Sequence, residues 1–204
     1  NTTGDQNTAI GNISGFFNQT GSRNTYVGYY AGYGAVNNSH SDNTSVGYSA
    51  LKLVSTGADN VTMGAYAGIN ITTGSNNVMI GKSAGNAYNS SNVVAVGKGS
   101  LATINSANGN GSVAVGHESQ TAMTSGSSNT SLGYLTLHDI TTEIGNVAIG
   151  YKCGEFIRND ASDFNVIIGQ EACVGGTAQR DYNVAIGYRA MGSAASQNNI
   201  GAIN

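Results

Sequence analysis

Residues 146–150 read Asn-Val-Ala-Ile-Gly, and this five-residue phrase returns along the whole chain with few changes. Its glycines are Gly11, Gly28, Gly47, Gly64, Gly81, Gly97, Gly116, Gly133, Gly150, Gly169 and Gly187, spaced 16 to 19 residues apart. A fixed period of this length is typical of stacked repeat proteins, in which each repeat contacts only its neighbours. The sequence therefore predicts a single elongated repeat domain over residues 1–204 rather than a globular enzyme with one buried site.

The composition argues against several classes of function. The chain of 204 residues has 30 Gly, no Pro and no Trp, only 9% charged residues and a formal net charge of -3. Without a basic run, binding to nucleic acid through its phosphates is not expected. No apolar run approaches the roughly 20 residues of a membrane-spanning helix, so we expect no direct membrane insertion by this segment. The sequence begins and ends inside a repeat, and we expect it to be a segment of a longer chain.

The residue types within the phrase predict a short strand. With Asn as position 1 and Gly as position 5, position 2 is always Thr or Val, and position 4 is Ile, Val, Leu or Met. Alternate residues of a strand share one face, so we expect positions 2 and 4 to face the interior and position 3 to face outward. Position 3 carries no charge in any of the eleven phrases. Such a neutral stripe predicts a lengthwise interface with identical copies of the chain.

Small residues also recur after the phrase. The third residue after each glycine is Ser14, Ala31, Ala50, Ala67, Ala84, Ser100, Ser119, Thr136, Cys153, Ala172 or Ala190. We expect a second short strand there, followed by a polar loop of turn residues. The predicted fold class is all-β: a parallel β-roll or β-solenoid of about eleven coils of 16–19 residues, stacked about 4.8 Å apart.

Two further columns recur with the period. Position 1 is asparagine in nine phrases, where stacked amides can form a structural ladder from coil to coil: Asn7, Asn24, Asn43, Asn60, Asn77, Asn129, Asn146, Asn165 and Asn183. The residue directly after the glycine is a tyrosine in five coils: Tyr29, Tyr48, Tyr134, Tyr151 and Tyr188. Exposed tyrosines offer a flat apolar ring with a polar tip, so these five are candidates for contact with a receptor or a glycan, or for an aromatic ladder that only stiffens the rod.

Residues with other chemistry are few and scattered. No nucleophile elbow, zinc-protease motif or phosphate-binding loop is present, and the three histidines lie in different coils, so we expect no cofactor and no metal site. Cys153 and Cys173 lie in neighbouring coils at offsets that disfavour a disulfide. Glu155, Asp160 and Asp163 cluster in one coil, and paired carboxylates are what a polysaccharide-cleaving enzyme needs. Acidic residues in loops are usually solvated, so we expect no enzymatic activity.

The repeat resembles two families of fibrous proteins. Residues 24–32 (Asn-Thr-Tyr-Val-Gly-Tyr-Tyr-Ala-Gly) and 183–191 (Asn-Val-Ala-Ile-Gly-Tyr-Arg-Ala-Met) are similar to the Asn-Thr-Ala-Ile-Gly repeats of tail-fibre-like proteins from phages and bacteria. Members of that group often end in an endosialidase-type chaperone domain. The Val-Ala-Ile-Gly core of residues 147–150 is also similar to the head repeats of trimeric autotransporter adhesins.

The resemblance implies a left-handed coil, a homotrimer and a role in attachment. The first expectation is an extracellular fibre segment, a shaft or head of a viral tail fibre that supports binding to a host glycan or protein receptor. The alternative is a trimeric adhesin on the bacterial cell surface, and a polysaccharide-cleaving tailspike is a third, weaker reading. The repeat spacing, longer than that of the adhesin heads, favours the tail-fibre-like group.

Overall fold

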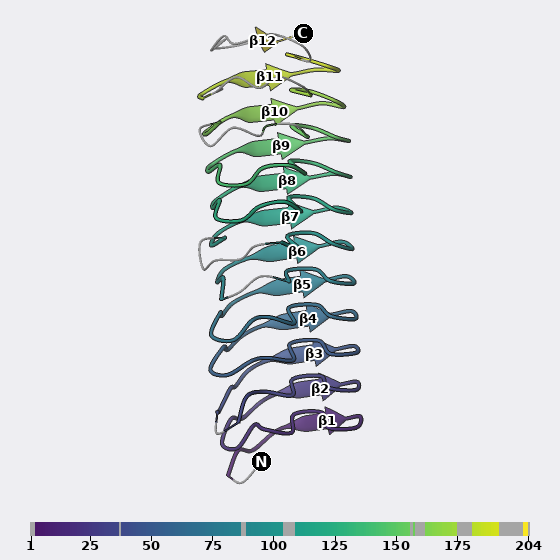
Figure 1. The fold of residues 1–204 in the computed structure, drawn as a ribbon, viewed down its shortest axis with the longest axis vertical. Helices are drawn as coiled ribbons and strands as arrows, with labels where there is room; N and C mark the ends of the chain where they lie inside the picture. Colours follow the sequence, from purple (N-terminus) through teal and green to yellow (C-terminus); the bar gives the residue numbers. More distant parts are fainter. Residues whose placement is uncertain are drawn as a thin grey trace.

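A computed structural model describes residues 3–36, 38–86, 89–103, 109–155, 157, 162–174 and 181–191, and the backbone of 202–203. Within these residues the chain is all-β and winds into a solenoid (Figure 1). The strands are β1 (Thr8–Ile10), β2 (Thr25–Val27), β3 (Thr44–Val46), β4 (Val61–Met63), β5 (Val78–Ile80), β6 (Val94–Val96), β7 (Val113–Val115), β8 (Thr130–Leu132), β9 (Val147–Ile149), β10 (Val166–Ile168), β11 (Val184–Ile186) and β12 (Ala202–Ile203). They form one parallel sheet in the order of the sequence, which confirms the predicted β-solenoid.

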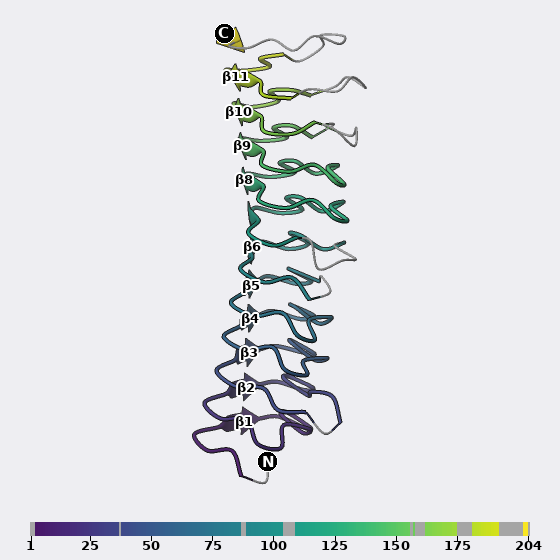
Figure 2. The ribbon, with the colours of Figure 1, turned by 90° about the vertical axis from the view of Figure 1, so that its left-hand side faces the viewer.

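The strands stack in register. Thr25 pairs with Thr44 and Val27 with Val46, and the same correspondence holds from each strand to the next, so every position of the phrase becomes a column along the sheet. Figure 2 shows the sheet along one side of the rod and the loops along the other. In Figure 1 the strands point to the right and the chain rises from the N-terminus at the bottom. Figure 2 shows that the strands lie on the far side of the rod in that view, behind the loops. A coil that rises while its far side runs from left to right is left-handed.

The two faces of each strand are reversed relative to the sequence prediction. In β2 to β11 the middle residue, position 3, is buried, whereas positions 2 and 4 are half-buried or exposed. The physical reason is the asparagine at position 1. Its amide points into the coil, where it bonds to loop carbonyl groups, and the two-residue period of a strand then carries position 3 inward as well. The neutral residues of position 3 therefore fill the interior and form no outer stripe.

The interior is narrow, and a cluster of apolar side chains fills it beside the asparagines of position 1. Position 3 contributes small or flexible residues such as Ala95 and Met79, and the returning part of each coil contributes larger ones such as Leu51, Ile71 and Leu137. The predicted column of small residues after each glycine is buried from Ala31 onward, because larger side chains would not fit opposite position 3. Cys153 and Cys173 are both buried, and they form no disulfide with each other, as expected from their offsets.

The returning segment is a run of turns, so the second strand predicted there is wrong. Ser49 and Leu51 have left-handed φ values of 53° and 51°. Their amides donate in opposite directions along the rod, from Ser49 to the carbonyl of Tyr29 (2.8 Å) and from Leu51 to that of Ala67 (2.9 Å). Each coil thus bonds its backbone to both neighbours without the extended geometry of a strand.

The glycine that ends each phrase turns the chain out of the sheet. Gly81 has a φ of +133°, and a Cβ atom built on it would lie 2.6 Å from the carbonyl carbon and oxygen of Gly97 in the next coil. Both the dihedral angle and the close approach of two backbones require glycine. The same contact recurs between Gly64 and Gly81, so this corner determines how closely the coils stack.

We expect Gly81→Ala to destabilise the rod by about 3 kcal/mol, because it combines backbone strain with steric overlap. Lys82→Ala is the matched control, since Lys82 is the exposed neighbour of the same corner and should change stability by less than about 0.5 kcal/mol. Denaturant unfolding followed by circular dichroism measures both. Equal midpoints for the two variants would contradict the role given to the corner.

Candidate functional surfaces

The outer face of the sheet is a continuous stripe of uncharged side chains. It is built from positions 2 and 4 of the phrase: Thr8, Ile10, Thr25, Val27, Thr44, Val46, Val61, Met63, Val78, Ile80, Val94, Val96, Val113, Val115, Thr130, Leu132, Val147, Ile149, Val166, Ile168, Val184 and Ile186. Leu132 is 49% exposed and Met63 is 45% exposed, and no charged residue interrupts the stripe. Large exposed apolar surfaces of this kind mark interaction sites.

The asparagines of position 1 form a buried ladder on the inner side of the same strands. The Oδ1 atom of Asn43 accepts from both the backbone amide (3.1 Å) and the Nδ2 atom (3.0 Å) of Asn60. The Nδ2 atom of Asn60 also donates to the carbonyl of Gly74 at 3.0 Å. The side chain of Asn60 therefore links its strand to the preceding coil and to the loop that follows in the sequence. This is the structural role predicted for the column.

The ladder is interrupted where two phrases lack asparagine. The amide of Val93 donates to the Oδ1 atom of Asn77 at 3.0 Å, and Val93 offers no side-chain oxygen to the next coil. Ser112 resumes the ladder, because its hydroxyl accepts from the amide of Asn129 at 3.3 Å. The interruption is thus confined to two neighbouring coils.

The tyrosine column lies at the glycine corners, beside the sheet. All five predicted tyrosines are exposed, by 40% at Tyr29 and 63% at Tyr188. Tyr134 and Tyr151 stack with ring centroids 5.5 Å apart and an angle of 9°, and Tyr29 stacks on Tyr48 at 5.5 Å. Within each stack the ring faces are turned toward each other, so the edges and hydroxyl groups are what solvent meets.

Near β1 to β4, further aromatic rings lie beside the tyrosines of the predicted column. Tyr30, Tyr33, Phe16 and Phe17 form edge and stacked contacts at 4.9 to 6.1 Å. Tyr30 joins them to the predicted column through Tyr29, at 4.3 Å. The signal was available in the sequence as the run Tyr29-Tyr30, but none of the four rings lies directly after the glycine of a phrase: Tyr30 is two residues after it, Phe16 and Tyr33 are five, and Phe17 is six.

The acidic residues considered for catalysis have structural partners. Glu155 is buried, and its Oε1 atom lies 3.2 Å from the Nζ atom of Lys152. Asp163 accepts a hydrogen bond from the amide of Ile144 at 2.8 Å. Asp160 lies outside the described residues. In the part of the chain that the structure describes, no three His, Cys, Asp or Glu residues are grouped as metal ligands would be.

His40 is a titratable group inside the rod. Its Nδ1 atom lies 2.7 Å from the hydroxyl of Tyr26, and that hydroxyl also donates to Asn24 at 2.8 Å. The Nε2 atom is buried without a hydrogen-bond partner among the described residues. Burial lowers the pKa of His40 from its ordinary 6.5 to about 4, because the charged imidazolium would lose its hydration.

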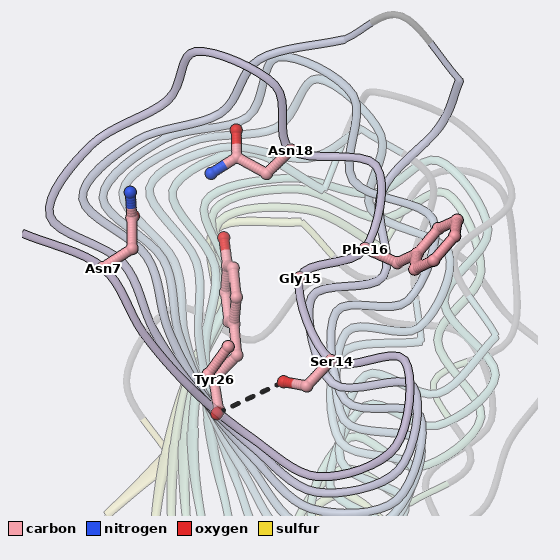
Figure 3. Close-up of a pocket in the computed structure, with 7 residues that line it drawn as sticks. Asn7, Ser14, Gly15, Phe16, Asn18 and Tyr26 are labelled. Carbon is pink, nitrogen blue, oxygen red and sulfur yellow. Dashed lines mark hydrogen bonds between the residues drawn. The ribbon is translucent and has the colours of Figure 1, made fainter. Parts of the chain in front are cut away.

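A cavity of about 370 Å³ opens at the first coil (Figure 3). Tyr26 stands across it, and the hydroxyl of Ser14 donates to the carbonyl of Tyr26 at 3.3 Å. The polar side chains of its lining, Asn7 and Asn18, already bond to the carbonyl of Gly21 at 2.9 and 3.1 Å. The cavity is the end of the interior column and presents no group suited to bind or transform a ligand.

Comparisons with family models, with curated proteins and with solved structures gave no match for this chain. In the described ranges of the chain, no helix has the length and apolar character needed to cross a membrane.

We expect Asn60→Ala to destabilise the rod by about 3 kcal/mol. The substitution leaves the carbonyl of Gly74 and the amide of Asn77 buried without their partner, and each such loss costs about 1–3 kcal/mol. Asn12→Ala removes an exposed amide and is the matched control. Thermal and denaturant unfolding measure the difference. If the two variants are equally stable, the ladder does not hold the coils together.

Stability should fall as the pH drops from about 6.5 to about 4, because His40 takes up a proton in the unfolded chain before it does so in the rod. The loss amounts to about 3 kcal/mol at most and levels off below the lower pKa. Unfolding of the wild type and of His40→Gln across this pH range isolates the contribution, and His138→Gln controls for the loss of a half-buried histidine. If the stability of His40→Gln depended on pH as that of the wild type does, His40 would not be the cause of the loss.

Proposed function

We propose that this chain is a structural segment of an extracellular fibre, in which three identical rods associate along the outer face of the sheet. The observation that carries the proposal is the uncharged stripe of positions 2 and 4 along the strands β1 to β11. A single rod would leave this apolar surface in water. Association of copies removes it from water at about 25 cal/mol per Å².

The period of the stripe favours a second copy of the same chain as its partner. The side chains repeat once per coil, at the spacing of about 4.8 Å that parallel strands impose. A globular partner could match only a few coils, whereas an identical rod matches all of them in register. The number three comes from the resemblance to tail-fibre-like proteins and autotransporter heads, because the stripe alone does not distinguish two copies from three.

The function inferred for such an assembly is attachment. A stiff rod spaces a binding tip from its base, and three parallel copies multiply weak contacts with a host glycan or protein receptor through avidity. The repeat length, compared with that of the families the chain resembles, favours a viral tail fibre over a bacterial surface adhesin. This proposal includes no catalytic step, and it gives Glu155 and Asp163 the structural roles that their contacts describe.

Native light scattering tests the assembly directly. We expect a mass of three times the 20.7 kDa of one chain. The triple variant Met63→Glu, Leu132→Glu, Ile149→Glu places charges at three exposed points of the stripe and should lower the mass toward one chain.

The matched control is Thr56→Glu, Thr73→Glu, Thr103→Glu, which adds the same charges to exposed positions of the loops. It should keep the mass of the wild type, and circular dichroism should show the same fold in all three proteins. A wild type that is monomeric at high concentration would overturn the proposal. An interface on the loop side would be indicated if only the threonine variant dissociated.

A further inference from the structure

The glycine corners carry a second column of side chains, separate from the apolar stripe. The residue directly after each glycine comes from successive coils whose backbones are hydrogen-bonded in register. The amide of Gly99 donates to the carbonyl of Lys82 at 3.0 Å, and the amide of Glu118 donates to the carbonyl of Lys98 at 2.9 Å. Leu135 bonds in the same way to His117 at 3.0 Å. Side chains of this column therefore follow one another along the rod axis.

The middle of the column is basic. Lys82, Lys98 and His117 are consecutive members of it, and both lysines are exposed. Neither lysine forms an ion pair among the described residues, although the chain as a whole carries a net charge of -3. Two ammonium groups held on adjacent coils repel each other, and a bound anion would relieve that repulsion.

Aromatic rings flank the basic centre on both sides. Toward β1 the next member is Ala65 and the one after it is Tyr48, whose ring contacts that of Tyr66 at 5.2 Å. Toward β11 the ring of His117 stacks on Tyr134 at 5.2 Å, and Tyr151 follows at 5.5 Å. From Tyr48 to Tyr151 the column spans six coil steps, which is about 30 Å at the spacing of parallel strands.

The full column contains no acidic residue. Its eleven members are Asn12, Tyr29, Tyr48, Ala65, Lys82, Lys98, His117, Tyr134, Tyr151, Gln170 and Tyr188. One carboxylate lies beside the basic centre: the Oε1 atom of Glu118 is 3.7 Å from the Nε2 atom of His117. Hydroxyl, amide and ammonium groups on a scaffold of exposed ring edges make the column polar and positive over its central part.

We infer that this column is a binding track for a linear anionic glycan that lies along the rod, with its acidic groups at Lys82 and Lys98 and its sugar rings beside the flanking tyrosines. Sugar hydroxyl groups can both donate hydrogen bonds to and accept them from the phenol groups of Tyr134 and Tyr151, which are 45% and 44% exposed. The inference extends the proposed function, because it assigns a chemical class to the receptor that the fibre meets.

An acidic glycan fits the track better than a nucleic acid does. Two lysines release few counterions, so the phosphate backbone of a nucleic acid would gain little affinity here. Single strands of nucleic acid bind by stacking bases on open aromatic faces, and the faces of Tyr134 and Tyr151 are turned toward each other at an angle of 9°. A sugar chain can instead bind through hydrogen bonds to the phenol hydroxyl groups that remain exposed.

Isothermal titration calorimetry with the assembled protein tests the track. The probes are hyaluronan oligosaccharides, which carry carboxylates, heparin oligosaccharides, which carry sulfates, uncharged dextran, and a single-stranded DNA oligonucleotide of similar length. We expect hyaluronan, heparin or both to bind at least tenfold more tightly than dextran and DNA. The ratio between the first two identifies carboxylate or sulfate as the recognised group.

The variant Lys82→Gln, Lys98→Gln removes both ammonium groups of the basic centre without touching the sheet face or the interior. It should weaken the binding of the acidic probe at least tenfold and reduce the dependence of affinity on salt. Lys52→Gln is the matched control, because Lys52 lies off the column, with its ammonium 4.7 Å from the ring centre of Tyr30. It should bind as the wild type does.

Light scattering on the same samples separates this inference from the proposed assembly. An assembled wild type that binds none of the probes overturns the track and leaves the fibre proposal standing. Equal binding of dextran, tighter binding of DNA, or equal losses in the lysine pair and in Lys52→Gln would also overturn it. A protein that binds the acidic probe as a monomer supports the track and contradicts the assembly.

Discussion

The buried amide at the start of each strand is the interaction on which the rest of the structure depends. It satisfies backbone groups of two coils at once, and it must point inward to reach them. That orientation determines which side chains of the strand are buried. Because side chains alternate along a strand, position 3 then faces inward and positions 2 and 4 face outward. The narrow core, the apolar outer face and the register of the coils all follow from where one polar side chain is placed.

Much of the fold could be predicted from the sequence because the period is explicit. The glycine of each phrase, such as Gly81, predicts a corner that only glycine can form. Eleven such corners at a fixed period predict a stack of coils. Which face of each strand is buried could not be predicted in the same way. Val and Ile at positions 2 and 4 are the usual residues of a core, and only the hydrogen bonds of the asparagines reveal that here they cover the outside.

The surfaces were partly predictable. The tyrosines beside the corners follow the period, so their exposure could be anticipated from Tyr29 and Tyr134. His40 lies in a loop of unequal length, where the offset from the glycine no longer indicates position. Phe16 and Tyr33 share an offset, but a phenylalanine or tyrosine ring occurs there in only two coils, which is too few to indicate a column. Their contacts arise from side chains that meet between coils. The loops vary while the ladder and the corners stay fixed, which is how one rod can carry a distinct surface at each level.

The ladder also gives the rod a direction. Wherever two asparagines follow each other in the ladder, the oxygen of the first faces forward along the chain, and the amide of the second faces back toward it. Seen end-on, one terminus of such a stack presents donors and the other presents acceptors, so the two ends are chemically unlike. Two rods could be continued into one another only head to tail. If two rods met at ends of the same kind, asparagine oxygens would face oxygens, or amides would face amides. The solenoid is therefore polar along its axis.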